Sequence, residues 1–277
     1  MYVLVVHTVN EVREALESKK QIGLVPTMGA LHAGHKRLIQ TARGECGVLV
    51  VSIFVNPLQF GPTEDYARYP RALPQDLDVC KGNGVDLVFA PSADEMYPMP
   101  QRTFIEVERL GSQLCGKFRP GHFRGVATVV LKLLNIVQPH RAYFGEKDMQ
   151  QLTIVRRIAL DLNLPVTIVG VPTVRGPDGL ALSSRNKYLD DEERKAARAL
   201  YKALQEAARR IYSGERQASK VREAALAVLT AWPVIRVEYF DIVDPYELQP
   251  VGTISGRVHI AAAIWIGATR LIDNLSA

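Results

Sequence analysis

Short apolar runs alternate with helix-type patterns through the first 171 residues, and this alternation constrains the fold more than any other feature. The strand-like runs lie at residues 3–7, 22–26, 48–54, 87–90, 142–144 and 166–171. The segments between several of these runs carry helical signals, such as a possible cap at Thr8. Strands that are each followed by a helix typically form a parallel sheet with right-handed crossovers. The sequence therefore predicts an α/β domain here.

Residues 125–137 carry the strongest helical pattern of the chain. The apolar residues of one face recur at helical spacing, at Val126, Val129, Val130, Leu133, Leu134 and Val137. Leu131 and Ile136 widen this face. A helix that is apolar over most of its circumference is expected to be buried, so we expect this helix to lie at the centre of its domain.

The pattern changes after Pro172. A turn sequence at residues 175–179 is followed by helical segments at residues 191–212 and 219–230, and then by strand-like runs at residues 236–241, 258–265 and 269–272. Helices followed by strands form a different layer arrangement from the first half. We therefore predict a first domain of residues 1–173 and a smaller α+β C-terminal domain of residues 174–277 with antiparallel strands.

Composition narrows the class of protein. Lys and Arg number 34 and Asp and Glu 29, a net charge of +5 that permits a phosphate-bearing substrate but is small for a nucleic-acid-binding protein. Cys46, Cys80 and Cys115 are far apart, which gives no support to a zinc cluster or a redox dithiol. No apolar run approaches the ~20 residues that span a bilayer, and the N-terminal run resembles a strand more than a signal peptide. We expect a cytoplasmic protein.

The segment from Pro26 to His35, with the sequence PTMGALHAGH, is the sharpest candidate for chemistry. It joins an expected strand to an expected helix, and the start of a helix attracts anions through its unpaired N–H groups. Gly29 and Gly34 allow close backbone approach, while His32 and His35 can direct donors to one spot. A glycine-containing turn with two surface histidines is the alternative. The Walker, GxGxxG, HExxH and GxSxG motifs are absent.

Two further segments offer phosphate ligands. The sequence FGEKDMQQ, residues 144–151, lies before an expected helix, where Lys147 could reach a phosphate and Gln151 could contact a polar substrate. The sequence LSSR, residues 182–185, places two hydroxyl groups and a guanidinium on an expected loop. An ordinary capped helix and an ordinary polar loop are the respective alternatives.

Two segments could contact the rest of a substrate. The sequence FVNPLQFG, residues 54–61, follows the strongest expected strand, and Asn56 and Gln59 could bind hydroxyl and carboxylate groups there. Asn56 could equally stabilise a turn with the following proline. The basic, glycine-rich residues 116–125 could line an anionic pocket or lie in solvent, and the residues favour neither interpretation.

Taken together, these segments resemble the pantothenate synthetases, or pantoate–β-alanine ligases. PTMGALHAGH, FVNPLQFG, RPGHFRGVATVV, FGEKDMQQL, VGVPTVR, LSSRNKYL and the C-terminal TRLIDN stand in this family's order and spacing. The resemblance implies a Rossmann-like domain with the HxGH motif, a smaller C-terminal domain that covers the ATP site, and a homodimer. It also implies ATP and Mg²⁺, with pantoate and β-alanine as the other substrates.

The family's reaction has two steps: ATP converts pantoate to pantoyl adenylate, and β-alanine then displaces AMP to give pantothenate. The resemblance implies catalytic roles for His35, His32 and Lys147, with His35 as the proton donor. The implied ATP ligands are Met28, Gly29, Ala30, Leu31, His32, Ala33, Gly34, His35, Gly145, Glu146, Lys147, Asp148, Val174, Leu182, Ser183, Ser184 and Arg185. Gln59, Gln151 and Asn56 are implied for pantoate or β-alanine.

Three points stay open at this stage. Asp76 and Asp148 are both candidates to help hold Mg²⁺. Another HxGH nucleotidyltransferase, which adenylates a different small acid or a phosphate ester, is the closest rival, although it would not need the FVNPLQFG segment. A nucleic-acid binder is a more distant rival, because it would show a basic stripe with interleaved aromatic residues, whereas aromatic residues make up only 7% of this chain.

Overall fold

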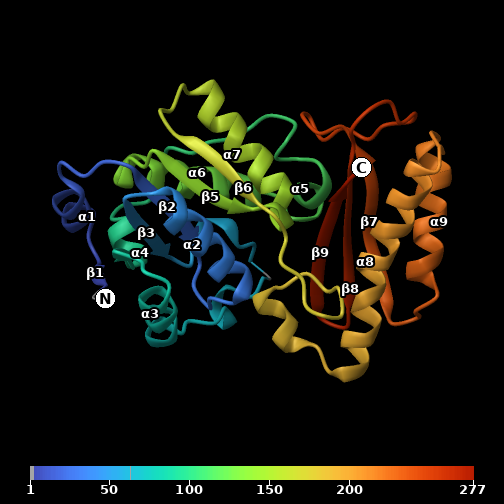
Figure 1. Cartoon of the computed structure of the whole chain (residues 1–277), viewed down its shortest axis with the longest axis horizontal. Coiled ribbons are helices and arrows are strands. Elements are labelled where there is room, and N and C mark those ends of the chain that lie inside the picture. Colours follow the sequence, from blue (N-terminus) through green and yellow to red (C-terminus); the bar gives the residue numbers. More distant parts are fainter. Residues whose placement is uncertain (1–2, 63) are drawn as a thin grey trace. The chain divides into compact units, whose positions relative to one another are not determined.

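The computed structural model describes residues 3–62 and 64–277, which form two compact units (Figure 1). One unit contains the chain up to Gly111 together with Arg119–Glu146 and Gln151–Pro172. The other contains Ser112–Phe118, Lys147–Gln150 and Thr173–Ala277. The predicted domains were continuous in sequence, whereas the second unit also includes two short segments from before residue 173. The predicted covering of an ATP site by the C-terminal domain stays a prediction.

The first unit is built on six parallel strands in the order β1-β4-β3-β2-β5-β6. The strands are β1 Leu4–Val6, β2 Ile22–Thr27, β3 Val48–Ile53, β4 Leu87–Phe89, β5 Arg141–Gly145 and β6 Thr167–Val171. Each lies within two residues of a strand-like run in the sequence. The predicted Rossmann-like α/β fold is therefore confirmed.

The strand order changes direction at β2. From β2 the chain moves to β3 and β4 on one side, and it later returns to place β5 and β6 on the other side. Ligands of open α/β sheets bind at the carboxyl ends of the strands where such a reversal occurs. Because β2 and β5 are neighbours, the loops that follow them emerge side by side at that edge.

Helices pack on both faces of this sheet. The main ones are α1 Val9–Leu16, α2 Ala33–Glu45, α3 Leu73–Gly82, α6 His122–Val137 and α7 Met149–Asp161. Right-handed crossovers place α2 and α3 on one face and α1, α6 and α7 on the other. On the first face, Leu38 and Ile39 of α2 pack with Val25, Val51 and Cys80. Two short helices, α4 Ala93–Met96 and α5 Leu114–Phe118, complete the α-helices before residue 173.

Helix α6 is buried along most of its length, as its sequence predicts. All six residues of the apolar face are buried. The helix begins at His122, three residues before Gly125, so part of the expected basic loop is helical. Gly125 lies against the segment after β3, where a Cβ atom would overlap the carbonyl group of Leu58. This contact requires glycine and fixes α6 against the FVNPLQFG segment.

The second unit contains an antiparallel sheet in the order β7-β8-β9 and two long helices, in addition to α5. Its elements are α8 Asp191–Tyr212, α9 Ala218–Thr230, β7 Ile235–Val243, β8 His259–Ile266 and β9 Thr269–Ser276. Alanine and leucine side chains of α8 pack with Phe240, Ile260 and Ile264 of the sheet. A two-residue turn, Gly267 and Ala268, joins β8 to β9 and pairs Ile266 with Thr269. The predicted α+β arrangement is confirmed, although β9 continues four residues beyond the predicted run.

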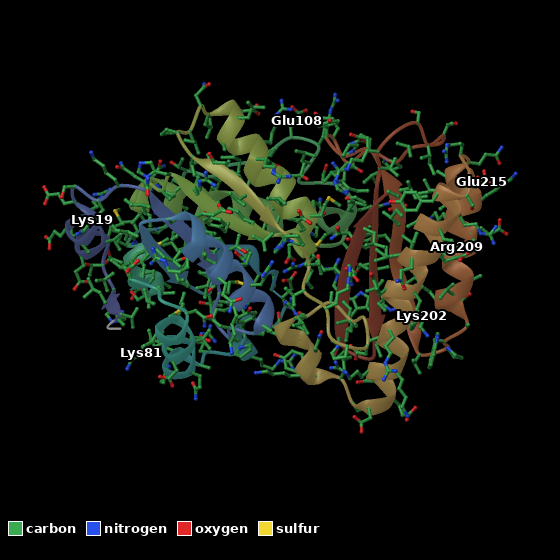
Figure 2. The ribbon with its side chains drawn as sticks, in the orientation of Figure 1. Lys19, Lys81, Glu108, Lys202, Arg209 and Glu215 are labelled. Atoms are coloured by element: carbon green, nitrogen blue, oxygen red, sulfur yellow. The ribbon has the colours of Figure 1, made fainter. Side chains whose placement is uncertain are left out.

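Charged side chains are distributed over both units. Lys19 and Lys81 of the first unit and Lys202 and Arg209 of the second are exposed and project away from the ribbon (Figure 2). Glu206 pairs with Arg209 and Arg210 on α8. Within the described residues, no helix combines the length and the apolar character needed to cross a bilayer.

The contact between Gly125 and Leu58 predicts a measurable effect on stability. Gly125→Ala should lower the free energy of unfolding by about 1–3 kcal/mol, because a buried Cβ atom would displace the backbone after β3. Gly44→Ala is the control: Gly44 is also helical, and a Cβ atom there would meet nothing within 4 Å. Urea unfolding should show Gly44→Ala unchanged or more stable by up to about 1 kcal/mol. Equal stability of the two variants would contradict the assigned contact.

Candidate functional site

The loop between β2 and α2 has an unusual backbone conformation. Gly29 and Ala30 both have left-handed φ angles, +80° and +51°. Thr27 Oγ1 accepts a hydrogen bond from the Gly29 N–H at 3.1 Å and donates to the Ser52 carbonyl on β3 at 2.8 Å. Glycine adopts positive φ without steric cost, whereas Ala30 needs compensating contacts.

Asp76 of α3 supplies those contacts. Its carboxylate accepts hydrogen bonds from the N–H groups of Ala30 at 2.9 Å and Leu31 at 2.7 Å. The side chain is 2% exposed, so these bonds form largely out of water. Charge-assisted bonds of this kind are stronger than bonds between neutral groups. Asp76 therefore anchors the loop, and its suggested part in binding Mg²⁺ stays a prediction.

His32 and His35 form the beginning of α2. His32 Nδ1 accepts from the Gly34 N–H at 3.1 Å, and His35 Nδ1 accepts from the His32 N–H at 3.3 Å. The two ring centroids are 4.1 Å apart. An Nδ1 atom that accepts an N–H carries no hydrogen, so each neutral ring has its hydrogen on Nε2. Both rings are thus in the tautomer that donates from Nε2.

The beginning of α2 suits a negatively charged ligand. The helix has 13 residues, and helix N-termini carry about half a positive charge together with unpaired N–H groups. No acidic residue lies in the first turn. A Cβ atom on Gly34 would lie 2.8 Å from His32 Cε1, so the central glycine of the HxGH motif leaves space for the first histidine ring.

Asn56 is buried and bonded within the protein. Its Oδ1 accepts from Leu58 N at 3.3 Å and from Tyr97 Oη at 2.8 Å, while Nδ2 donates to Gln59 Oε1 and the Gly125 carbonyl, each at 3.1 Å. Burial raises the pKa of Tyr97, so its hydroxyl stays protonated and donates. The Asn56 amide orients Gln59, as the turn-stabilising alternative implies. Its role in substrate binding stays a prediction.

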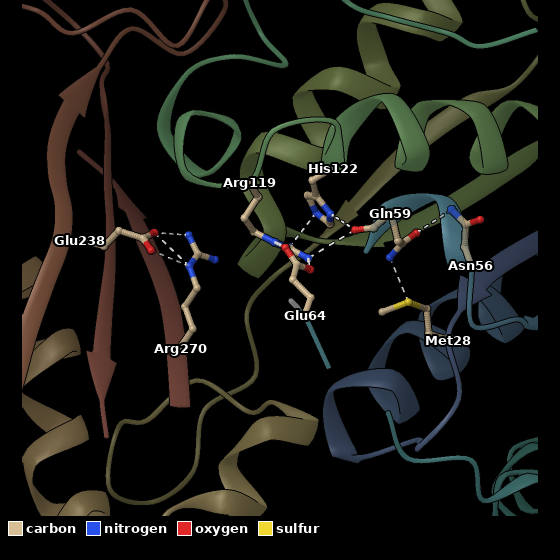
Figure 3. Close-up of polar contacts among 8 residues, drawn as sticks. All are labelled: Met28, Asn56, Gln59, Glu64, Arg119, His122, Glu238 and Arg270. Carbon is tan, nitrogen blue, oxygen red and sulfur yellow. Dashed lines mark hydrogen bonds and ion pairs between the residues drawn. The ribbon is translucent and has the colours of Figure 1, made fainter. Parts of the chain in front are cut away.

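Gln59 and Met28 come together from two different motifs. Gln59 Nε2 lies 3.0 Å from Met28 Sδ, and Figure 3 shows these side chains pointing toward each other. Gln59 is 8% exposed and lies in the short 3₁₀ turn Pro57–Gln59 that Asn56 caps. The structure therefore places this predicted substrate ligand beside the loop that carries the predicted ATP ligands.

Arg119 and His122, which were not individually predicted, contact the Gln59 carbonyl, and Glu64 holds Arg119 in place. Arg119 pairs with Glu64 through two hydrogen bonds, one of them from Nε to Oε1 at 2.9 Å (Figure 3). His122 Nδ1 lies 2.8 Å from the Gln59 carbonyl, which can only accept, and Nε2 lies 3.0 Å from Arg119 Nη1, which can only donate. His122 is therefore neutral with its hydrogen on Nδ1.

Of the predicted residues around Lys147, Lys147 and Asp148 belong to the second unit, whereas Gly145, Glu146 and Gln151 belong to the first. The 3₁₀ turn Glu146–Asp148 follows β5 and leads into α7. Asn274 Nδ2 donates to the Lys147 carbonyl at 3.0 Å. Of the two adjacent glutamines, Gln150 is 6% exposed and bonds to the Gln113 carbonyl and the Cys115 N–H. Gln151 is only partly buried, in agreement with the choice of Gln151 as a substrate ligand, which stays a prediction.

The predicted segment 182–185 follows a small hairpin in the same unit. The Leu182 N–H donates to the Val174 carbonyl at 2.9 Å, so these two predicted ATP ligands are paired. Ser183 Oγ accepts from the Arg185 N–H at 3.3 Å and caps the 3₁₀ turn Ser184–Tyr188. Ser183 thus has a structural role besides its predicted binding role.

Neither a metal cluster nor a reactive thiol adds to the site. Across residues 3–62 and 64–277 there is no group of three or more His, Cys, Asp and Glu side chains that could hold a metal ion. The three cysteines are free and buried. Burial and the nearby Asp76 charge raise the pKa of Cys80 to about 12, which leaves its thiol protonated and poorly nucleophilic.

Known proteins resemble this chain over nearly its full length. The family model for pantoate-beta-alanine ligase matches residues 4–276. A pantothenate synthetase from Moorella thermoacetica is 54% identical, with 96% of this chain and 94% of that protein covered. The crystal structure of pantothenate synthetase from Thermus thermophilus has a TM-score of 0.95 and 49% identity, with 99% of both chains covered.

A second solved structure was determined with ligands. It is a pantoate-beta-alanine ligase from Francisella tularensis, complexed with beta-gamma ATP and beta-alanine. Its TM-score is 0.80 and its identity 35%, over 99% of this chain and 97% of that chain.

The anchoring role of Asp76 can be tested without a substrate. Asp76→Asn should lower the free energy of unfolding by about 1–3 kcal/mol, because the new amide turns an N–H donor toward a backbone N–H in a buried place. Asp78→Asn, at an exposed position in the same helix, should change stability by less than about 0.5 kcal/mol. If chemical denaturation gives the same small change for both variants, Asp76 does not anchor the loop.

Proposed function

Because the chain belongs to the pantoate-beta-alanine ligase family, we propose that it condenses (R)-pantoate with β-alanine at the expense of ATP. The observation that carries this proposal is the family match over residues 4–276, which takes in all of the motifs above. The complex of a relative with ATP and β-alanine supports two of the substrates. The products are pantothenate, AMP and pyrophosphate.

In the first step, a carboxylate oxygen of pantoate attacks the α-phosphorus of ATP. The bond between that phosphorus and the bridging oxygen breaks, and pyrophosphate leaves with the electron pair. Negative charge builds up on the phosphoryl oxygens, where preorganised donors are most effective. We assign this task to the Nε2–H groups of His32 and His35 and to the beginning of α2. His35, which the resemblance gives as the proton donor, directs its Nε2–H to the leaving group, and Lys147 neutralises phosphate charge.

In the second step, the amine of β-alanine attacks the carbonyl carbon of pantoyl adenylate. The carbon–oxygen bond to AMP breaks, the amine loses a proton and an amide forms. We assign Gln59 and Gln151 to pantoate, with Gln59 also contacting β-alanine and Asn56 orienting Gln59. Burial of Gln59 and its bond to Asn56 support this assignment, since a preorganised amide loses little freedom when a ligand binds.

The remaining ligands of ATP follow from the motifs. We propose that the nucleotide contacts Met28, Gly29, Ala30, Leu31, His32, Ala33, Gly34, His35, Gly145, Glu146, Lys147, Asp148, Val174, Leu182, Ser183, Ser184 and Arg185. The positions of the first eight residues after β2 and of Gly145 at the end of β5 support this, because these neighbouring strands flank the reversal in strand order.

Magnesium fits this site as a companion of the triphosphate. The lack of a three-residue acidic cluster among the described residues agrees with an ion held mainly by phosphate oxygens and water, together with one carboxylate. Asp148, next to Lys147, and Asp76 are the carboxylates proposed for that place. When bound, the ion would neutralise charge on the phosphates.

The proposal extends to assembly and location. We propose a homodimer, as in the family that the chain resembles, and a cytoplasmic location. The three unpaired cysteine thiols support a reducing compartment.

His35 should be essential for the first step. His35→Ala should slow pantoate-dependent release of pyrophosphate from ATP by about 10²–10³-fold, because a transition-state donor is lost. His35→Asn separates chemistry from structure: its Oδ1 can still accept the His32 N–H, but it lacks the Nε2–H donor. Both variants should be slow, and His7→Ala, at an exposed histidine, should be normal.

Two outcomes would count against this assignment. If His35→Asn were as active as the wild type, the role of His35 would be to cap the helix and not to donate in the transition state. Pyrophosphate release that ignores pantoate but depends on another small acid or a phosphate ester would replace the proposed function with that of a different HxGH nucleotidyltransferase.

Loss of the Gln59 side chain should affect the binding of pantoate and not the binding of ATP. Gln59→Ala should raise KM for pantoate roughly tenfold or more and leave KM for ATP within about twofold, because one or two hydrogen bonds to pantoate are lost. Gln40→Ala, at an exposed glutamine of α2, is the control. Steady-state kinetics with each substrate varied in turn measures both constants, and a parallel rise in both would mean that Gln59 is structural.

A further inference from the structure

Two neighbouring polar residues near the end of β9 contact different segments of the second unit. Asp273 is 4% exposed and shares a face of the sheet with Leu271 and Leu275, which pack toward α8 and α9. Successive side chains of a strand point to opposite faces, so Asn274 lies on the other face. These residues belong to the TRLIDN segment, to which the reaction assigns no role.

Asn274 holds the backbone of the predicted phosphate-binding lysine. Its Nδ2 donates to the Lys147 carbonyl at 3.0 Å. The same segment is tied to the second unit by Gln150, whose side chain bonds to the Gln113 carbonyl at 2.7 Å and the Cys115 N–H at 3.1 Å. Lys147–Gln150 consequently belongs to the second unit, although the residues on both sides of it belong to the first.

Asp273 holds the hairpin that precedes Ser183. Its two carboxylate oxygens accept a pair of hydrogen bonds from Arg175, at 2.5 and 2.9 Å. The Arg175 guanidinium also lies 3.7 Å from the centre of the Tyr201 ring on α8. A planar fork that is both paired and stacked has a single orientation, so Arg175 is fixed between the sheet and α8.

The backbone of Arg175 belongs to a hairpin that ends directly before residues 183–185, so fixing Arg175 also fixes the start of that segment. Arg175 is bridged to Ala181, and the Leu182 N–H donates to the Val174 carbonyl at 2.9 Å. Gly176 N–H donates to the Leu180 carbonyl at 2.9 Å. The hairpin is therefore closed directly before residues 183–185, and its position depends on Asp273.

We propose that Asp273 and Asn274 are positioning residues for ATP: Asn274 sets the place of Lys147, and Asp273 sets the place of residues 182–185 through Arg175. This inference rests on the proposed function, which assigns both segments to the ATP phosphates. Two neighbouring residues on opposite faces of one strand thereby fix the positions of two proposed phosphate-binding segments that are 35 residues apart in sequence.

A fixed backbone at residue 147 matters because the lysine side chain is flexible. Its four-carbon side chain holds the ammonium at a defined place only if the backbone beneath it is fixed, and small displacements of such groups are costly for the rate. Asn274→Ala removes the side-chain donor but leaves the backbone contacts of residue 274 with Asp273 and Arg175 in place. The consequence of losing this side chain can therefore be measured with both backbone contacts intact.

A double-mutant cycle tests the Asn274 arm. Asn274→Ala should lower kcat/KM for ATP in pantoate-dependent pyrophosphate release roughly tenfold and leave KM for pantoate unchanged. Lys147→Ala should lower it further, and the double variant should be no slower than Lys147→Ala, because residues that act through one another are not additive. Multiplicative losses would overturn the proposal, since Asn274 would then act independently of Lys147.

Two controls separate positioning from stability. Ser276→Ala alters the same face of β9 two residues along, and Ile264→Val removes a methyl group from the core of the same sheet. Both should keep the wild-type kcat/KM for ATP, and Ile264→Val should do so despite a lower melting temperature. A loss of ATP kinetics in Ile264→Val equal to that in Asn274→Ala would overturn the proposal, because instability alone would then explain it.

The Asp273 arm has a conservative variant. Arg175→Lys keeps the charge but removes the fork, and it should raise KM for ATP severalfold with KM for pantoate unchanged. Equal KM values for ATP in Arg175→Lys and the wild type would overturn the proposed role of Asp273. If Lys147→Ala is slow while Asn274→Ala and Arg175→Lys are normal, the inference fails and the proposed function stands. If Lys147→Ala itself has normal kinetics, the assigned role of Lys147 is wrong, and the proposed role of Asn274 is wrong with it.

Discussion

A buried carboxylate that accepts two backbone N–H groups holds the chain where β2 turns into α2. Ala30 has a left-handed conformation that a non-glycine residue rarely adopts, and Asp76 stabilises it from another helix. The direction in which α2 begins depends on this loop, and the orientations of His32 and His35 depend on α2. The chemistry assigned to the first step therefore depends on Asp76, whose carboxylate bonds to the backbone of Ala30 and Leu31.

The two units stabilise their site residues in different ways. In the first unit, side-chain amides and one charged pair around Gln59 hydrogen-bond to one another and to the backbone. In the second unit, Asp273 and Asn274 of β9 bond to two short segments, one at Arg175 and the other at Lys147. Polar networks of either type limit the orientations of a ligand-binding side chain before the ligand arrives, which reduces the entropy lost on binding.

Local sequence patterns predict the fold well and the site only in part. Strand runs, the apolar face of α6 and the HxGH segment all carry their signal within a dozen residues, and the parallel sheet follows from them. Two of the four partners of Asn56 lie 41 and 69 residues away, and Glu64 bonds to Arg119 across 55 residues. Such pairings arise from the tertiary fold and leave no periodic trace. This is why the sequence alone could not show that Asn56 orients Gln59 and why Glu64 gave no signal.

The turn between β8 and β9 has a consequence for how the chain can change in length. Its two residues set the pairing of Ile266 with Thr269 and so decide which face of the sheet each residue of β9 occupies. A shift of one residue moves every side chain of a strand to the opposite face. An insertion of one residue at Gly267 would place Ile272 toward Arg175 and Asp273 toward the Lys147 carbonyl, whereas a deletion would place Asn274 toward Arg175 and Leu275 toward that carbonyl. This hairpin should therefore tolerate substitutions far better than changes in length.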